Sequence, residues 1–362
     1  MKKEISSKNF IKTFFVTFLI LAVLVVGLVV FFDPFYHYHK PLPFLKSVLS
    51  EKEYQVPGSL DHFDYDAVIL GSSVAENYNN RWFDDNFDCR SIKAIRSYGA
   101  TYDLIYYLNR AFDTHELKYV FMNLDPTSVT RECEDTFEFT GAPLYLYDKN
   151  PVNDIEYLLN KDVLFKQIPY TIASSYMRDY DEGESYNWYS SKTFSKDAVF
   201  SHYYRSTTPE PVKDEDYYMD LAKQNVALIK ETAEKHPETQ FYIFIPPYSI
   251  VWWDSIYNVG ETGCYLKAEK YAVSELLKEK NIRVFNFQQD LDIVYNLDLF
   301  MDSLHFSQNI NHVLCDYLKE GKYEIKDESD MNSSFEIVSE YAFNAAEYLN
   351  ENYGDDIQYS NP

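Results

Sequence analysis

Hydrophobic and polar positions along this chain follow two different rhythms. Short apolar runs recur, and between them lie stretches in which apolar residues repeat every three or four positions. Short apolar runs predict buried strands, and the three-and-four spacing predicts helices with one buried face. The strands are predicted near residues 67–70, 91–95, 119–122, 241–245 and 282–285, and the most regular helix is predicted over 219–233.

Short apolar strands that alternate with amphipathic helices are typical of a parallel sheet covered on both faces. We therefore predict an α/β fold of three layers, α/β/α, with a roughly five-stranded parallel sheet over residues 63–322. Further helices are predicted after Asp103, at 266–278 and after Ser307, whose side chain is expected to cap the last of them.

Three parts of the chain fall outside this alternation. Residues 34–62 are rich in proline and are predicted to be a juxtamembrane linker. Residues 126–213 are rich in Tyr, Ser, Asp and Asn, and they are too long for a structureless loop in a compact domain. We predict an insertion there, with a helix around 152–164. Residues 323–362 are predicted to be an acidic tail with one helix near 335–349.

The N-terminal apolar run at residues 14–32 is long enough to cross a membrane. Asp33 follows it, and lysines precede it against the single Glu4: Lys2, Lys3, Lys8 and Lys12. The positive-inside rule therefore predicts that residues 1–33 form a cytoplasmic stub and a transmembrane anchor, with the rest of the chain outside the cell. The competing interpretation is a cleaved signal peptide. Its apolar part is expected to end in small residues, which Val30-Phe31-Phe32-Asp33 does not.

The composition narrows the possible partners. The 362 residues include 33 Lys and Arg against 57 Asp and Glu, a formal net charge of −24, and 46% of them are hydrophobic. This is enough apolar material for a sizeable core, and so acidic a surface repels the phosphates of nucleic acids.

No residues have the spacing of metal ligands, so neither a metal nor a cofactor is predicted. No disulfide is assigned among the four cysteines, Cys89, Cys133, Cys264 and Cys315.

The first predicted strand ends in Gly71-Ser72-Ser73. Ligands of parallel sheets bind at the carboxyl ends of strands, and a serine on a tight turn there points into the crevice beside a helix N-terminus. Backbone amides at that turn are then available to a developing oxyanion. The alternative, with equal weight, is that both serines only cap the following helix.

A histidine follows the last predicted strand, in Met301-Asp302-Ser303-Leu304-His305. A serine hydroxyl is a poor nucleophile until a base takes its proton, and an imidazole held in one tautomer by an acceptor is suited to that task. Asp302, three residues earlier, is placed to be that acceptor. His305 alone among the eight histidines has this setting. The alternative is a surface aspartate and a turn histidine without a partner.

Together, Gly71-Ser72-Ser73 and Asp302-x-x-His305 resemble the SGNH (GDSL-like) hydrolase superfamily over roughly residues 64–320. The resemblance implies a flavodoxin-like fold with Ser73 as the nucleophile, His305 as the base and Asp302 as the residue that orients it. The sequence Gly71-x-Ser73-x-Ala75 also nearly fits the nucleophile elbow of α/β-hydrolases. In those proteins, however, the acid and the histidine are separate elements of the sequence.

The same resemblance implies an oxyanion hole formed by Ser73, Gly99 and Asn123. Gly99 lies in Ser97-Tyr98-Gly99-Ala100, after the second predicted strand. The third donor is an asparagine side chain after the third strand, where the chain reads Asn123-Leu124-Asp125-Pro126. Asn123 is able to donate, whereas an ionised Asp125 in that place is not.

An anchor followed by an exported SGNH-like domain resembles bacterial cell-envelope proteins, such as the anchored protein of teichoic-acid D-alanylation and polysaccharide O-acetyltransferases or esterases. This implies a serine acyltransferase that moves acyl or acetyl groups onto a surface polysaccharide or teichoic-acid-like polymer, with a membrane-bound O-acyltransferase as the acyl donor. A carbohydrate esterase and a non-catalytic scaffold of envelope-polymer assembly are the alternatives. Aromatic residues are candidates for the acceptor cleft, with core packing as the other interpretation: Tyr145, Tyr147, Tyr248, Trp252 and Trp253.

Overall fold

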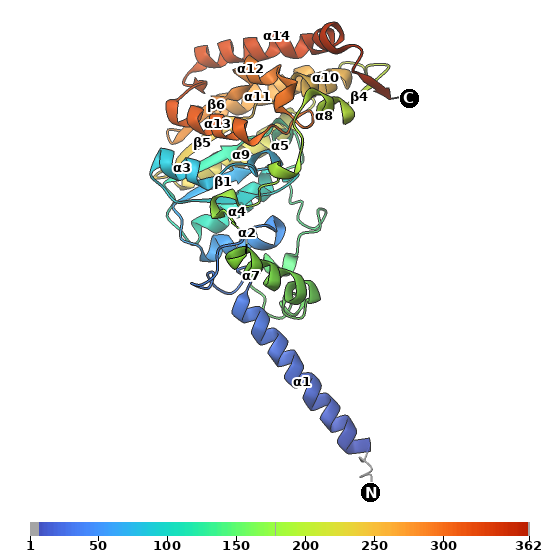
Figure 1. Cartoon of the computed structure of the whole chain (residues 1–362). Helices are drawn as coiled ribbons and strands as arrows, with labels where there is room; N and C mark the ends of the chain where they lie inside the picture. The colour runs from blue at the N-terminus through green and yellow to red at the C-terminus, as the bar shows by residue number, and fades with distance from the viewer. Residues whose placement is uncertain (1–6, 178, 361–362) are drawn as a thin grey trace. The chain divides into compact units, whose positions relative to one another are not determined.

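The computed structural model describes residues 7–177 and 179–360 (Figure 1). The chain divides into two compact units. The first consists of residues 1–63 and 141–182, and the second of residues 64–140 and 183–362. Lys2, Lys3 and Glu4, on which part of the topology prediction rests, lie outside the described residues.

The second unit is an α/β fold built on a six-stranded sheet in the order β2-β1-β3-β5-β6-β7. The first five strands of this order are parallel, and β7 is antiparallel to β6 at the edge. The parallel strands coincide with the five predicted ones, which confirms an α/β fold with a mostly parallel sheet. Their bounds are β1 Ala67–Gly71, β2 Ser91–Ile95, β3 Tyr119–Asn123, β5 Gln240–Ile245 and β6 Ile282–Asn286, and β7 is Glu324–Ile325.

Helices cover both faces of this sheet. Crossovers between parallel strands are right-handed, so the reversal of strand order after β2 places the helix between β1 and β2 on the face opposite to the next three helices. Consistent with this, α4, α9 and α11 pack side by side, and α3 packs against α13. Their bounds are α3 Asn80–Phe87, α4 Thr101–Phe112, α9 Met219–Lys235, α11 Thr262–Leu276 and α13 Gln308–Glu320.

Ser307 precedes α13 as predicted, but its side chain makes no capping hydrogen bond. Its carbonyl oxygen instead accepts from the Ile310 amide at 2.9 Å. The prediction of a side-chain cap is therefore wrong.

The C-terminal segment is an integral part of the second unit. Residues 323–362 supply β7 and the long helix α14, Glu328–Tyr353, which packs on α11 and on α10, Ile250–Asn258 (Figure 1). The helix predicted near 335–349 lies within α14. The prediction of a tail is wrong because apolar residues recur at helical spacing and bury one face of α14: Met331, Phe335, Val338, Ala342, Ala345 and Leu349. Near the chain end, β8, Gln358–Ser360, pairs in parallel with β4, Tyr204–Ser206.

The proline-rich segment 34–62 belongs to the compact first unit and is not a simple linker. It contains α2, Lys52–His62. The buried side chain of Gln55 accepts the amides of Ser50 and Glu51 at 2.8 and 2.7 Å, and it donates to the carbonyls of Pro34 and Val48 at 2.9 and 2.8 Å. One side chain thus satisfies four main-chain groups of an irregular segment, which the proline content did not indicate.

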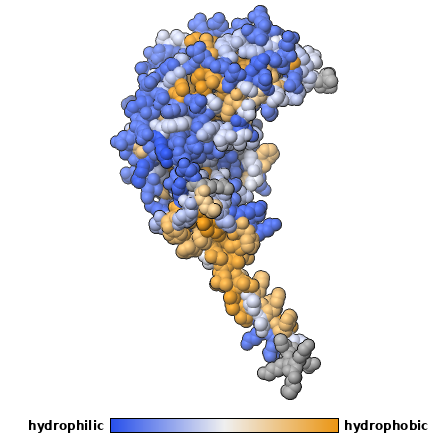
Figure 2. Space-filling model, in the orientation of Figure 1, coloured by the Kyte–Doolittle hydropathy of each residue, from blue (hydrophilic) through white to orange (hydrophobic). Residues whose placement is uncertain are grey.

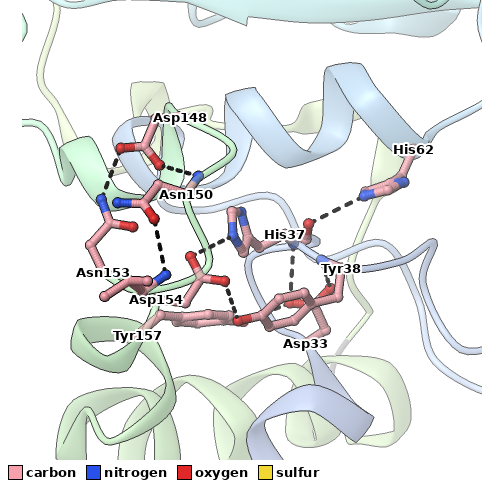
Figure 3. A network of polar contacts seen from close by, with 10 residues as sticks. Asp33, His37, Tyr38, His62, Asp148, Asn150, Asn153, Asp154 and Tyr157 are labelled. Carbon is pink, nitrogen blue, oxygen red and sulfur yellow. Dashed lines mark hydrogen bonds and ion pairs between the residues drawn. The ribbon is translucent and has the colours of Figure 1, made fainter.

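A polar network holds the turn that follows the first helix (Figure 3). Buried Asp33 accepts the main-chain amides of His37, Tyr38 and His39 at 2.7–3.1 Å and the Tyr157 hydroxyl at 2.8 Å. Asp154 in turn accepts from the Tyr38 hydroxyl at 3.0 Å and lies 3.2 Å from the His37 ring. These bonds join residues 33–39 to residues 154–157 within the first unit.

The first helix, α1, spans Ser7–Phe32, and its apolar side chains are exposed, as the orange surface in Figure 2 shows. Among the described residues it is the one helix long and apolar enough to cross a membrane. Exposed apolar side chains over this length need an apolar environment.

The insertion predicted at 126–213 is divided between the two units. Residues 141–182 belong to the first unit, and residues 126–140 and 183–213 belong to the second. The helix predicted around 152–164 is shorter, α6 at Ile155–Leu158, and the longer helix of this part is α7 at Ile168–Tyr176.

Candidate active site

The turn after β1 carries the predicted nucleophile. Gly71 ends the strand, and Ser73 begins a short 3-10 helix, Ser73–Ala75. A Cβ atom on residue 71 would lie 2.8 Å from the Cβ of Ala75 and 2.9 Å from the Cβ of Asn123. Only glycine allows the strand to pass this close to both neighbours, so Gly71 sets the position of the serine that follows.

We expect Gly71→Ala to destabilise the protein by roughly 1–3 kcal/mol, since overpacking of a tight core has this cost. The added methyl group must displace the turn that carries Ser73 or the end of β3. Thermal unfolding of the detergent-solubilised chain measures the change. Gly27→Ala, where a Cβ meets nothing within 4 Å, is the matched control. An unchanged melting temperature for Gly71→Ala contradicts the close packing seen here.

The structure brings the three predicted residues together from distant parts of the chain. Ser73 Oγ lies 2.7 Å from His305 Nε2, and His305 Nδ1 lies 2.7 Å from Asp302 Oδ2. The other carboxylate oxygen of Asp302 accepts the main-chain amides of Leu304 and His305 at 3.0 and 2.8 Å. An acceptor at Nδ1 favours the tautomer with its proton there, which leaves the Nε2 lone pair for the serine hydroxyl.

Asp302 is held in its ionised form. Burial raises the pKa of its carboxyl group. The hydrogen bond and charge of His305, together with the two main-chain amides, lower this pKa by more than burial raises it, so the net pKa lies below the ordinary value. A carboxylate next to the imidazole stabilises the imidazolium that forms when the base takes a proton. The Asp302 side chain is therefore suited to the orienting role predicted for it.

Ser73 and His305 lie on the wall of a cavity of about 410 Å³ in the second unit. This volume is within the range of small-molecule sites. Side chains that carry hydroxyl groups dominate the wall, and Leu304 is its one aliphatic residue among the lining residues. The others are Ser72, Tyr98, Gly99, Asp125, Thr127, Ser128, Thr130, Arg131, Tyr218, Tyr248 and Tyr265.

The predicted oxyanion donors are not all directed at this cavity. The Gly99 amide donates to the Arg96 carbonyl at 3.1 Å, although Gly99 lines the wall. Asn123 is fully buried outside the lining residues, and its amide donates to Asp125 Oδ1 at 2.9 Å. Ser73 begins a short helical turn, where main-chain amides lack intrahelical partners, so its amide stays a predicted donor. The prediction for Gly99 and Asn123 is not supported in this conformation.

Asp125, and not Asn123, is the residue of this segment that lines the cavity. It is 2% exposed, and its Oδ1 accepts the hydroxyl of Tyr248 as well as the Asn123 amide. Burial raises the pKa of Asp125, while interactions with Ser72, Tyr248 and Asn123 oppose the rise. The Asn123 amide is thus engaged by the Asp125 carboxyl, a contact that the sequence did not show.

Of the aromatic residues considered for an acceptor cleft, Tyr248 lines the cavity. Trp252 and Trp253 are buried in the core, at 4% and 0% exposure. Tyr145 and Tyr147 belong to the first unit. The sequence did not indicate three further lining residues, Arg131, Tyr218 and Tyr265, because each comes from a segment without a recognisable motif. The same holds for Trp188, which contacts Ser73 and His305.

No protein-family model matches this sequence, and no curated protein sequence matches it significantly. The resemblance to SGNH hydrolases therefore stays a prediction. The described residues contain no group of three His, Cys, Asp or Glu side chains that could hold a metal ion. The four cysteines are free thiols.

Proposed function

We propose that this chain is a membrane-anchored serine acyltransferase of the cell envelope, with Ser73 as nucleophile, His305 as base and Asp302 as the orienting acid. The observation that carries the proposal is the pair of 2.7 Å hydrogen bonds that links the three side chains at a cavity wall. A serine is activated when its hydroxyl lies within hydrogen-bond distance of a base and a third group orients that base.

In this mechanism His305 Nε2 takes the proton of Ser73 as its oxygen attacks the carbonyl carbon of an ester. The tetrahedral intermediate collapses, the alkoxide of the donor leaves with the proton from His305, and an acyl-Ser73 ester remains. A hydroxyl of the acceptor then loses its proton to His305 and attacks the acyl carbon. The acyl group passes to the acceptor and Ser73 regains its proton.

The envelope setting is supported by α1, whose exposed apolar length fits a single-pass anchor. In this proposal the N-terminus lies in the cytoplasm and the candidate active site lies outside the cell. The acceptor is a surface polysaccharide or a teichoic-acid-like polymer, and a membrane-bound O-acyltransferase supplies the acyl group. The net charge of −24 favours a neutral glycan over a polyanionic polymer, because like charges repel.

A non-catalytic scaffold is the second candidate, and one observation favours it. The Gly99 and Asn123 donors are engaged within the protein, and an oxyanion donor is worth about 10²–10³ in kcat in serine hydrolases. Donors often reach their catalytic positions only in the substrate complex, so labelling of Ser73 decides between the two candidates.

We expect a fluorophosphonate probe to label the full-length chain in detergent covalently, with the label on Ser73 and not on Ser72 in peptide mass spectrometry. Ser73→Ala is expected to abolish labelling and His305→Ala to slow it strongly, because the hydroxyl then lacks its base. Ser307→Ala and His312→Ala, away from the cavity wall, are the matched controls. A wild-type chain that remains unlabelled supports the scaffold.

An acceptor-dependent rate separates transfer from hydrolysis. A transferase is expected to turn over a p-nitrophenyl ester slowly in water alone and faster when a soluble oligosaccharide is added. A carbohydrate esterase shows no such dependence.

A further inference from the structure

A lysine is buried in the sheet close to the candidate active site. Lys93 lies on β2 with none of its surface exposed, and its ammonium donates to the main-chain oxygens of Glu76 and Tyr78 at 2.7 and 2.5 Å. It also donates to the main-chain oxygen of Ser185, and it lies 3.3 Å from Oδ1 of Asn187. Each of the three ammonium protons therefore has an oxygen to meet.

The position is a costly one for a charge. Burial lowers the pKa of Lys93 to about 7, and the charges of Glu76 and Glu184 oppose the shift. An apolar side chain fills a strand position in a core without this cost. An apolar side chain, however, cannot connect residues 76–78 with residues 185–187, whose oxygens the Lys93 ammonium binds.

Both segments are next in sequence to residues of the candidate site or in contact with it. Residues 76–78 come directly after the helical turn that begins at Ser73, and residues 185–187 come directly before Trp188. Asn77 makes a second connection between these segments, because its Oδ1 accepts the main-chain amides of Trp188 and Tyr189 at 3.1 and 3.2 Å.

Trp188 reaches both members of the pair. Its indole N–H donates to the main-chain oxygen of Ser73 at 3.3 Å. Its ring packs against the His305 ring, with centroids 5.4 Å apart and planes at 87°. A ring held on one side by Asp302 and on another by an indole has little freedom to turn away from the serine.

We propose that Lys93 and Trp188 are positioning residues for the Ser73–His305 pair. The buried ammonium fixes residues 185–189 on the segment that follows the nucleophile, and Trp188 restrains the His305 ring at hydrogen-bond distance from Ser73. The effect on reaction rate rests on the proposed function, whereas the restraint on the ring does not.

The rate constant for fluorophosphonate labelling of the full-length chain tests the proposal. We expect Trp188→Leu and Lys93→Met each to lower it about 10- to 100-fold, a loss in the maximal labelling rate and not in the concentration of probe that half-saturates it. Trp188→Phe, which keeps a ring, is expected to recover most of the loss. The double variant is expected to be no slower than the slower single variant, because both act on one contact.

Trp82→Leu is the matched control, since Trp82 stacks on His312 with centroids 4.4 Å apart, away from the cavity wall. It is expected to label within twofold of the wild type. Wild-type rates in both Trp188→Leu and Lys93→Met overturn the proposal, and so do losses that multiply in the double variant. If Lys93→Met does not fold, Asn77→Ala removes the second connection and carries the same expectation.

A measurement without chemistry separates this proposal from the proposed function. With ¹⁵N-labelled histidine, the ring resonances of His305, assigned by their loss in His305→Gln, are expected to be sharp in the wild type and exchange-broadened in Trp188→Leu. If fluorophosphonate does not label the wild type but the resonances of Trp188→Leu are broadened, the acyl-enzyme is refuted and the positioning role is supported. Unchanged resonances in Trp188→Leu refute the positioning role even where Ser73 is labelled.

Discussion

Ser73→Ala is expected to lower kcat/KM for a small activated ester by about 10⁴- to 10⁶-fold, the range over which serine hydrolases lose activity without their nucleophile. The physical reason is that the hydroxyl oxygen 2.7 Å from His305 Nε2 is the atom that forms the acyl-enzyme. Steady-state kinetics with p-nitrophenyl acetate on the full-length chain in detergent measures the loss.

The three side chains are expected to behave as one unit. Ser73→Ala/His305→Ala is predicted to be no less active than Ser73→Ala alone, because the base has no task without the nucleophile. Asp302→Asn is predicted to lose about 10⁴-fold, since an amide at Nδ1 stabilises the wrong tautomer. Losses that multiply across the double variant contradict a shared mechanism.

Glu269→Gln is expected to stabilise the protein by roughly 3 kcal/mol at pH 7. Glu269 lies on α11, 1% exposed, and neither carboxyl oxygen makes a hydrogen bond of ordinary geometry. Burial raises the pKa of Glu269 from 4.5 to about 8, and only an interaction with Gln288 opposes the rise. The folded protein must therefore keep a proton on this group at a pH where the unfolded chain releases it.

The effect of Glu269 on stability depends on pH over a defined range. The folded-state pKa lies above the unfolded one, so the contribution of Glu269 to stability is fully present below about pH 4.5 and is lost as the pH rises toward about 8. The difference in unfolding free energy between Glu269→Gln and the wild type is expected to grow across this window. Urea unfolding of the detergent-solubilised chain at several pH values measures it.

Glu340→Gln, which changes an exposed acid on α14, is the matched control and is expected to show no such growth. A constant difference between Glu269→Gln and the wild type from pH 5 to pH 8 refutes the shifted pKa. A fall in stability on mutation at every pH shows instead that the carboxyl is satisfied in the folded protein.

Local pattern was sufficient for the parallel sheet. The five strands are short, mostly apolar runs, and nearly all of their residues are buried, so the signal of each lies within a few residues and needs no knowledge of its neighbours. Lys93 on β2 and Arg283 on β6 are the charged exceptions. The helix over 219–233 was predictable for the same reason, since its apolar stripe is continuous along the chain.

The edges of the fold were harder to predict because their structure depends on distant partners. The segment 34–62 lacks a regular pattern. Gln55 orders it through main-chain groups that lie up to 21 positions away, and Asp33 ties its start to the hydroxyl of Tyr157. The C-terminal helix carries an apolar stripe, but the charge of the surrounding residues concealed how much of the segment is helical.

The sequence by itself determined the α/β class, the apolar N-terminal helix and the two local motifs, a serine after the first strand and a histidine three residues after an aspartate. These are local features, set by periodicity and by spacing within a few residues. Only the tertiary structure decided that Ser73 and His305 meet, that Asp125 and not Asn123 lines the cavity, and that Trp188 contacts both members of the pair. Such contacts join positions far apart in the chain, and their geometry depends on how the sheet and its loops pack.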